Sequence, residues 1–189
     1  MREPRVRIGF VVAFALALAI AWAAPRPVEA ASAKAIDAAV DEALKNLYAS
    51  TPAAVELAKV AKGILVFPQV VKGGFIVGAE FGNGALRKQG VASGYYNTVG
   101  ASYGFQAGVE SFGYALFFVT DTALAYLDKS EGWQVGVGPS LTVIDEGVAK
   151  SFSTTTLKDD IYAFFFDQKG LMGGISLQGS KITRITPDP

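Results

Sequence analysis

The sequence predicts an α+β protein that is mainly β: a strongly coiled antiparallel sheet or small barrel of about eight strands, with two N-terminal helices and one short inserted helix. The spacing of apolar residues changes from the helical period to the strand period at Ile64. Glycines recur at short intervals from there onward. No linker or low-complexity stretch divides residues 31–189, so we expect them to form a single domain.

Residues 1–30 have the layout of a secretory signal peptide. Three arginines precede an uncharged run, Ile8–Ala24, and the small residues Val28 and Ala30 form a cleavage site before Ala31. We expect cleavage there and export to the periplasm or cell envelope of a bacterium, in association with a membrane. The run is just long enough to span a bilayer, so an uncleaved anchor is the alternative. The chain has no cysteine, which excludes a lipoprotein anchor.

Two helices are expected at the start of the domain. Ser32 can cap the first helix. Four apolar residues of this helix fall on one stripe: Ile36, Val40, Leu44 and Leu47. Thr51 followed by Pro52 restarts the chain as a second helix. The stripe either packs against the sheet or enters a membrane interface, as amphipathic helices do.

The rest of the domain alternates with a period of two, apart from Asp121–Lys129, which returns to helical spacing. Expected strands lie near residues 64–68, 73–82, 90–97, 100–110, 113–120, 133–144, 160–168 and 171–178. Consecutive phenylalanines such as Phe117 and Phe118 place rings on both faces of their strand, which is typical of strands buried on both sides.

Three of these strands share an unusual alternation, in which one face is apolar and the other is glycine with a few polar residues. Glycine at every second position marks strong coiling or the close approach of another group. One interpretation is that the glycine face curls or is covered by a helix. The other is a groove with a floor of bare backbone, lined by four polar residues: Glu80, Gln106, Glu110 and Gln134.

Composition excludes most familiar enzyme classes. The chain has no histidine and no cysteine, which removes imidazole-based triads, thiol nucleophiles and Cys/His metal sites. It has no P-loop, dinucleotide fingerprint or serine elbow. Residues 31–189 carry 13 basic and 15 acidic side chains, so a nucleic-acid partner is not expected. We expect no cofactor, no metal and no catalytic centre; an enzyme working through Glu80 and Glu110 is the weakest alternative.

Basic residues at segment ends and turns are either scattered over a solvated surface or gathered on one rim: Lys59, Lys62, Lys72, Arg87, Lys88, Lys181 and Arg184. A rim beside the first helix would attract anionic headgroups while the apolar stripe enters the interface. The residues expected to contact headgroups are Lys34, Lys59, Lys62, Lys72, Arg87 and Lys88.

Four segments, in this order and spacing, resemble the SYLF domain family: Lys72–Phe75, Gly100–Gly108, Gly136–Pro139 and Gly170–Gly179. The likeness runs from about Ala31 to Ile185. Known members are lipid-binding modules. Eukaryotic members bind phosphoinositides partly through an N-terminal amphipathic helix, some fungal members bind and bundle actin, and bacterial members are exported. The resemblance implies a membrane-lipid binder without a catalytic centre, and actin is not expected to be a partner of an exported bacterial chain.

The predicted function is therefore non-catalytic binding of anionic lipid at the bacterial envelope, through the helix stripe and the basic rim. The alternative is a structural or scaffolding envelope protein. Such a protein would bind another protein through the glycine face or an exposed strand edge.

Overall fold

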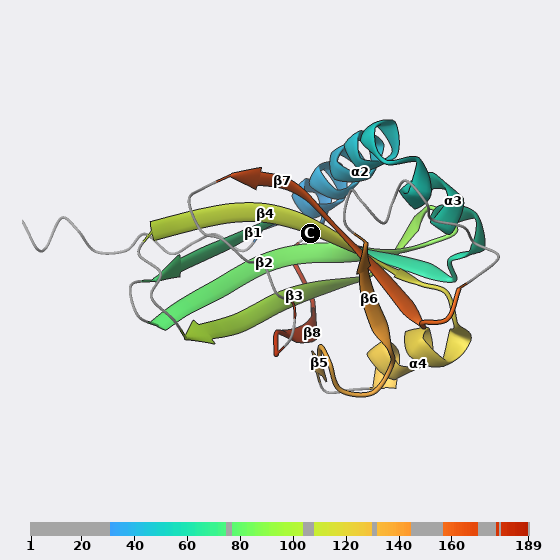
Figure 1. Ribbon diagram of the computed structural model, residues 1–189. Helices are drawn as coiled ribbons and strands as arrows, with labels where there is room; N and C mark the ends of the chain where they lie inside the picture. The colour runs from blue at the N-terminus through green and yellow to red at the C-terminus, as the bar shows by residue number, and fades with distance from the viewer. Residues whose placement is uncertain are drawn as a thin grey trace, which may run out of the picture. The chain divides into compact units, whose positions relative to one another are not determined.

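The computed structural model describes residues 31–74, 77–103, 108–129, 132–144, 157–169, 177 and 179–188 (Figure 1). Every described helix and strand lies in Ala31–Pro189, which forms a compact unit of its own. The expected leader at 1–30 lies outside the described residues, as does nearly all of the expected strand at 171–178. Within the described ranges, no helix has the length and apolar character required to cross a membrane.

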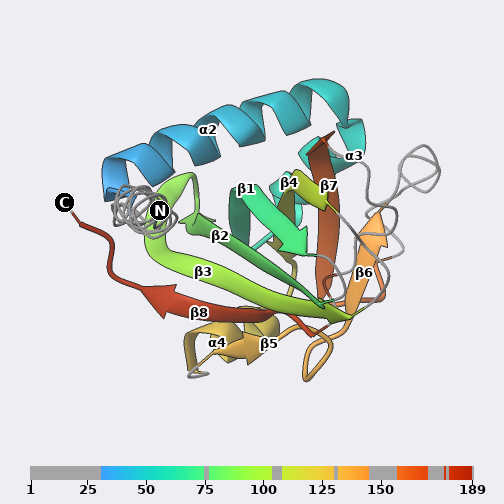
Figure 2. The same ribbon diagram turned by 90° about the vertical axis from the view of Figure 1, so that its left-hand side faces the viewer.

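Eight strands form one sheet, in the order β5-β8-β3-β2-β1-β4-β7-β6. Their bounds are Gly63–Gly74 (β1), Val77–Lys88 (β2), Val91–Tyr103 (β3), Gly108–Phe118 (β4), Trp133–Gln134 (β5), Leu141–Ile144 (β6), Ile161–Lys169 (β7) and Lys181–Ile185 (β8). All neighbouring strands are antiparallel except β6 and β7, which run parallel. The sheet curls into a half-barrel (Figure 2), which confirms the predicted fold class and adds one parallel pair.

The central strands are longer than the sequence predicts, so the expected breaks at 69–72, 98–99 and 111–112 are wrong. β1 runs through Pro68 because a bulge between Val66 and Gln69 accommodates this residue, which has no N–H to donate. β3 continues across residues 98 and 99, because Thr98 and Val99 pair with β2 on one side and β8 on the other. Pairing on both sides thus extends strands that local composition interrupts.

The expected strand at 133–144 is also wrong. Only β5 and β6 at its two ends are strands, and between them Gly136 and Gly138 have φ values of 94° and 91°. This left-handed backbone suits glycine and ends a strand, so these glycines make turns rather than a third glycine face. β8 was not among the expected strands, and it forms part of the sheet through β3.

Two helices precede the sheet, as predicted. α2 (Ala33–Ser50) begins after Ser32, whose side chain accepts a hydrogen bond from the backbone N–H of Ala35. α3 (Pro52–Val60) starts with a proline. Proline suits the first turn of a helix because backbone N–H groups there have no partner within the helix, so the N–H that proline lacks is not needed. The inserted helix is α4 (Asp121–Lys129), with the predicted bounds.

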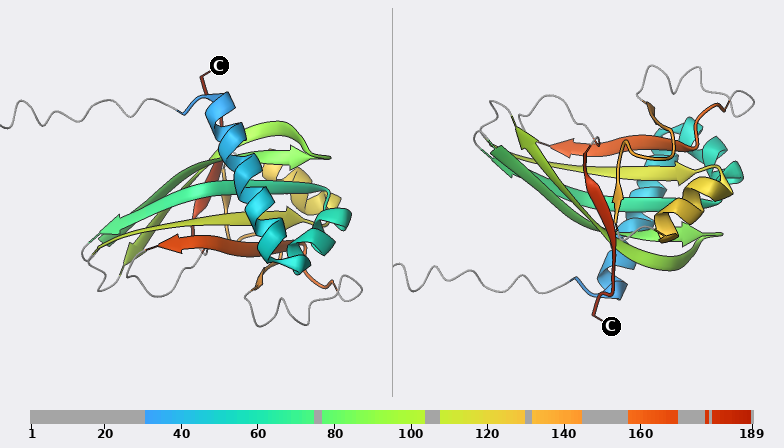
Figure 3. Two further views of the ribbon diagram at one scale, coloured as in Figure 1. Left: turned by 90° about the horizontal axis from the view of Figure 1, so that it is seen from above. Right: turned by 90° about the horizontal axis from the view of Figure 1, so that it is seen from below.

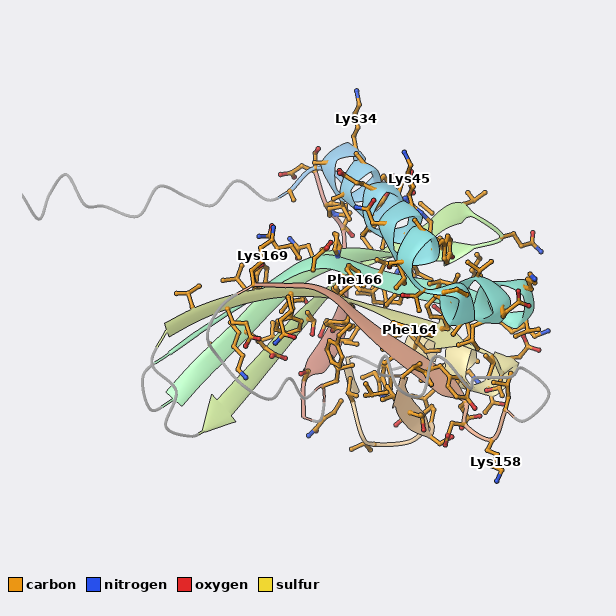
Figure 4. All side chains as sticks on the ribbon, turned by 45° about the horizontal axis from the view of Figure 1, so that its top comes forward. Lys34, Lys45, Lys158, Phe164, Phe166 and Lys169 are labelled. Carbon is orange, nitrogen blue, oxygen red and sulfur yellow. The ribbon has the colours of Figure 1, made fainter. Side chains whose placement is uncertain are left out.

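The helices lie on different faces of the curled sheet, with α2 and α3 over the outer face and α4 on the inner side (Figures 2 and 3). The inner core joins α4 and β5 to residues that include Leu65, Leu86, Tyr114 and Ile182. The outer core joins α2 and α3 to residues that include Val66, Ala85, Phe117 and Phe164. Figure 4 shows Phe164 and Phe166 of β7 on the side that carries α2.

The apolar stripe of α2 packs against the sheet. Ile36, Val40 and Leu47 are buried and Leu44 is half-buried, all in contact with the outer core. In the structure the stripe therefore packs against the sheet, as one of the two alternatives predicts. The expectation that the stripe enters a membrane interface is corrected. Packing against the sheet explains why one side of α2 is apolar. In this conformation these side chains are not available to a bilayer.

Candidate functional site

Three residues singled out in the sequence meet on the inner face of the sheet. Lys72 of β1 is the register partner of Glu80 on β2 and of Glu110 on β4. Because paired residues of adjacent strands point to the same side, the lysine lies between two glutamates. Their exposed fractions are 6%, 7% and 1%. From the sequence, Lys72 is a headgroup contact and the glutamates line a groove, whereas the structure joins all three in one inner polar cluster.

Glu80 is held by a hydrogen bond and by the space left at a glycine. The Ser180 hydroxyl donates to Glu80 Oε1 at 2.5 Å. Gly100 is the register partner of Glu80 on β3, and a Cβ at Gly100 would lie 2.4 Å from Oε1. The glutamate side chain therefore occupies the volume that the glycine leaves free.

The same observation corrects the glycine-face groove. A Cβ at Gly82 or Gly84 would lie 2.7 Å or 2.1 Å from a backbone oxygen of β1, so these glycines accommodate the bulged neighbouring strand. Gln134 lies on β5 and is exposed, whereas the two glutamates are buried. Gln106 lies outside the described residues. At Gly82, Gly84 and Gly100 the glycine face is thus filled by neighbouring atoms rather than open as a trough.

Glu110 has one satisfied oxygen and one unsatisfied oxygen. The Gln168 side-chain amide donates to Glu110 Oε1 at 2.9 Å. Glu110 Oε2 has no hydrogen-bond partner among the described residues, and neither do the buried hydroxyls of Thr98 and Tyr114. Buried polar atoms are rarely left unpaired, so this part of the inner face suits a small group that donates hydrogen bonds, such as water.

The electrostatics of the inner polar cluster disfavour an anionic ligand. Lys72 is buried and lies in register between two buried carboxylates, so its ammonium group is not displayed to a lipid headgroup. Burial raises the pKa of Tyr114, which keeps the phenol protonated. In the described part of the chain, no group of three or more acidic, histidine or cysteine side chains is arranged to hold a metal ion.

Arg87 serves α2 rather than a headgroup. Its Nη1 donates to Asp37 Oδ1 and its Nη2 to Asp41 Oδ1, both at 2.7 Å, and the Tyr95 hydroxyl donates to Asp37 Oδ2 at 2.9 Å. Burial lowers the pKa of Arg87, but the hydrogen bonds and charges of the two aspartates outweigh it and leave the pKa above its usual value. This corrects the assignment of Arg87 as a headgroup contact, because its guanidinium is buried and fully engaged.

The remaining predicted headgroup lysines do not gather on one rim. Lys59 pairs with Glu56 at 2.6 Å and Lys88 with Asp128 at 3.2 Å. Lys34 stands in the first turn of α2, whereas Lys62 follows α3, which lies beside the C-terminal end of α2 (Figure 3). The expected basic rim is thus dispersed.

The outer face of the sheet carries a feature that the sequence does not predict. Four large apolar side chains of the central strands are exposed: Val71 by 45%, Phe81 by 51%, Val99 by 46% and Val109 by 69%. Figure 3 shows α2 crossing only part of this face and leaving the far stretch of β1–β4 without a helix over it. We call these four residues the outer apolar patch.

The sequence contained only a partial signal for these arrangements. Gln168 and Ser180 reach the glutamates of the inner polar cluster through hydrogen bonds between distant segments, which local patterns do not reveal. The alternation of β2 does place Phe81 opposite the glutamate-bearing face. It could not show that the helices leave Phe81 uncovered.

Comparison with protein families matches residues 99–186 to the family described as "Ysc84: Las17-binding protein actin regulator". The match covers the C-terminal part of the segment that resembles the SYLF family in sequence. A search of curated proteins found no matching sequence.

Proposed function

Because residues 99–186 form a domain of the Ysc84/SYLF family, which is linked to lipid binding, we propose that this chain is a non-catalytic protein that binds membrane lipid. We propose anionic lipid as the preferred class and the bacterial cell envelope as the location. The SYLF family is not known for catalysis, which agrees with a binding role.

The observation that carries the proposal is the outer apolar patch. Single exposed apolar residues are common on proteins, but a contiguous group marks a surface that meets a partner or a membrane. Here four such residues lie on one uncovered face of the sheet. Exposed lysines such as Lys34 and Lys62, which have no ion pair within the described ranges, support a preference for negatively charged lipid.

The family's description names actin regulation, and we do not extend that role to this chain. The expected export of residues 31–189 places them where a bacterial cell has no actin to regulate. A scaffolding role through the glycine face has less support than lipid binding, because the space at Gly82, Gly84 and Gly100 is filled by neighbouring atoms.

The proposal is tested by co-sedimentation of residues 31–189, a compact unit, with lipid vesicles. We expect binding to vesicles of phosphatidylcholine with phosphatidylglycerol, and weaker binding to phosphatidylcholine alone. Binding should weaken as salt rises, because salt screens the attraction between lysines and lipid phosphates. Failure to bind either kind of vesicle at low salt would refute the proposed function.

A further inference from the structure

The outer apolar patch is a continuous row rather than a scatter of exposed residues. Val71 on β1 pairs with Phe81 on β2, and Phe81 pairs with Val99 on β3. Val109 on β4 pairs with Gly73, two residues beyond Val71. Directly paired side chains on one face lie about 5 Å apart and diagonal neighbours about 7–8 Å apart, so Val71, Phe81 and Val99 form one row and Val109 lies diagonally beside it.

This row continues into a lysine on each side. Val99 pairs with Lys181 on β8, and Val71 pairs with Ser111 on β4, which in turn pairs with Lys169 on β7. Both lysines are exposed, and neither forms an ion pair with any residue of the described ranges. Figure 4 shows Lys169 at the end of β7, on the side of the sheet that carries α2. The two cations are five strand spacings apart, roughly 24 Å along the sheet.

Within the described strands, the charged members of this register row are the two lysines. Glu80 and Glu110 belong to the same strands but point to the inner face, where they are buried. The next register row of the outer face is uncharged and consists of Gln69, Asn83, Asn97 and Thr183. Asp167, exposed two positions before Lys169, is the carboxylate nearest to that lysine in the sequence.

We propose that this face lies against an anionic bilayer, with the outer apolar patch in the interface and Lys169 and Lys181 at the lipid phosphates. The outer face of a half-barrel is convex, so the central strands project furthest and the flanking strands are set back. A membrane interface has the same layering, with apolar groups deepest and phosphates above them, and lysine side chains reach back to the phosphates. This inference rests on the proposed function and identifies its contact surface as the sheet rather than α2.

Serine substitutions with a matched control test the apolar part. Val99 and Val143 are exposed by 46% and 44%, but Val143 lies on β6, at the edge of the sheet and away from the row. We expect Val99→Ser and Phe81→Ser to bind phosphatidylglycerol vesicles about tenfold more weakly than the unmodified protein. Val143→Ser should bind as the unmodified protein does. Equal binding by the Val99→Ser and Val143→Ser variants would overturn the inference.

Charge substitutions test the flanks. The Lys169→Gln, Lys181→Gln double variant should bind these vesicles more weakly at low salt and show a shallower dependence on salt. Lys158→Gln is the control, because Lys158 is also exposed but lies far from Lys169 in Figure 4. An unchanged salt dependence in the double variant would remove the two lysines from the contact surface.

A direct probe of contact does not depend on affinities. Because the chain has no cysteine, Val99→Cys provides a single site for a polarity-sensitive fluorophore. Vesicles should shift its emission to the blue, while a probe at Val143→Cys should not respond. If the unmodified protein binds vesicles and the probe at position 99 does not respond, the docking face is wrong and a protein partner becomes the occupant to test. If the unmodified protein does not bind vesicles, the proposed function itself fails.

Discussion

At the scale of single residues, three glycines of the inner face, Gly82, Gly84 and Gly100, are explained by the atoms that lie opposite them. Gly100 has no side chain where Glu80 needs room, and Ser180 then fixes the carboxylate by a hydrogen bond. A glutamate can thus be buried in the sheet because its cross-strand neighbour has no Cβ. The alternation of glycine with polar residues therefore encodes packing between strands at this position, rather than an open groove.

Gly100→Ala should destabilise the fold. The added Cβ displaces Glu80 from Ser180, so we expect the free energy of unfolding to fall by about 1–3 kcal/mol. Urea denaturation measures the change. Gly73→Ala is the matched control, because its nearest neighbour is a Val109 side-chain atom at 3.8 Å, an ordinary contact. Similar losses in both variants would mean that strand propensity, and not the Glu80 contact, sets the cost.

At the scale of elements, α2 is attached to the sheet by an apolar stripe and by one arginine. The stripe supplies contact with the outer core, and Arg87 of β2 bridges two aspartates one turn apart on the helix. A guanidinium can bind both carboxylates at once because its N–H groups form a planar fork. The charged residues of α2 thus specify where the helix lies on the strands.

Replacing this arginine should loosen α2. In Arg87→Met, Asp37 keeps only Tyr95 as a hydrogen-bond partner, so we expect a loss of about 2–3 kcal/mol in unfolding free energy. Hydrogen exchange of the α2 amides should become faster. Lys59→Met breaks an exposed pair with Glu56 and should cost less than about 0.5 kcal/mol. Unchanged exchange in α2 of the Arg87 variant would contradict the role given to this arginine.

At the scale of the whole molecule, Asp160 connects segments that are distant in sequence. The Ser140 N–H and hydroxyl donate to Asp160 Oδ2 at 3.0 and 2.9 Å, and the Thr120 hydroxyl donates to Oδ1 at 2.9 Å. These bonds join Asp160, which directly precedes β7, to Ser140 and Thr120, which directly precede β6 and α4. Because they favour the ionised carboxylate, they lower the pKa of Asp160.

Acid should therefore weaken the fold partly through Asp160. A carboxyl group with a lower pKa in the folded state stabilises it above the unfolded pKa, about 3.9, and this stabilisation is lost as the pH falls through the folded value. We expect Asp160→Asn to be less stable at neutral pH and to lose less stability on acidification than the unmodified protein. Urea unfolding at several pH values measures both, and parallel pH profiles would contradict the prediction.

Local patterns predicted much of the fold. The Ser32 cap, the two N-terminal helices, the bounds of α4 and the mainly β character all follow from neighbouring residues, whose spacing reports which face is apolar. The break assigned at residues 98 and 99 and the strand assigned at 133–144 were wrong, because pairing with neighbours and left-handed glycines decide them. Of the expected site residues, Lys72, Glu80 and Glu110 lie in register on the inner face, and their common cluster was not predicted.

The fold class, the helices, the lack of histidine and cysteine and the resemblance to a lipid-binding family all follow from the sequence alone. The packing of the α2 stripe into the core, the pairing of Arg87 with the aspartates of α2, and the row of exposed apolar residues between Lys169 and Lys181 are seen only in the folded chain. Spacing along the chain shows which side of a strand a residue faces, but which residues become neighbours depends on strand register. The fold that results brings together positions as distant as Glu80 and Ser180, 100 residues apart.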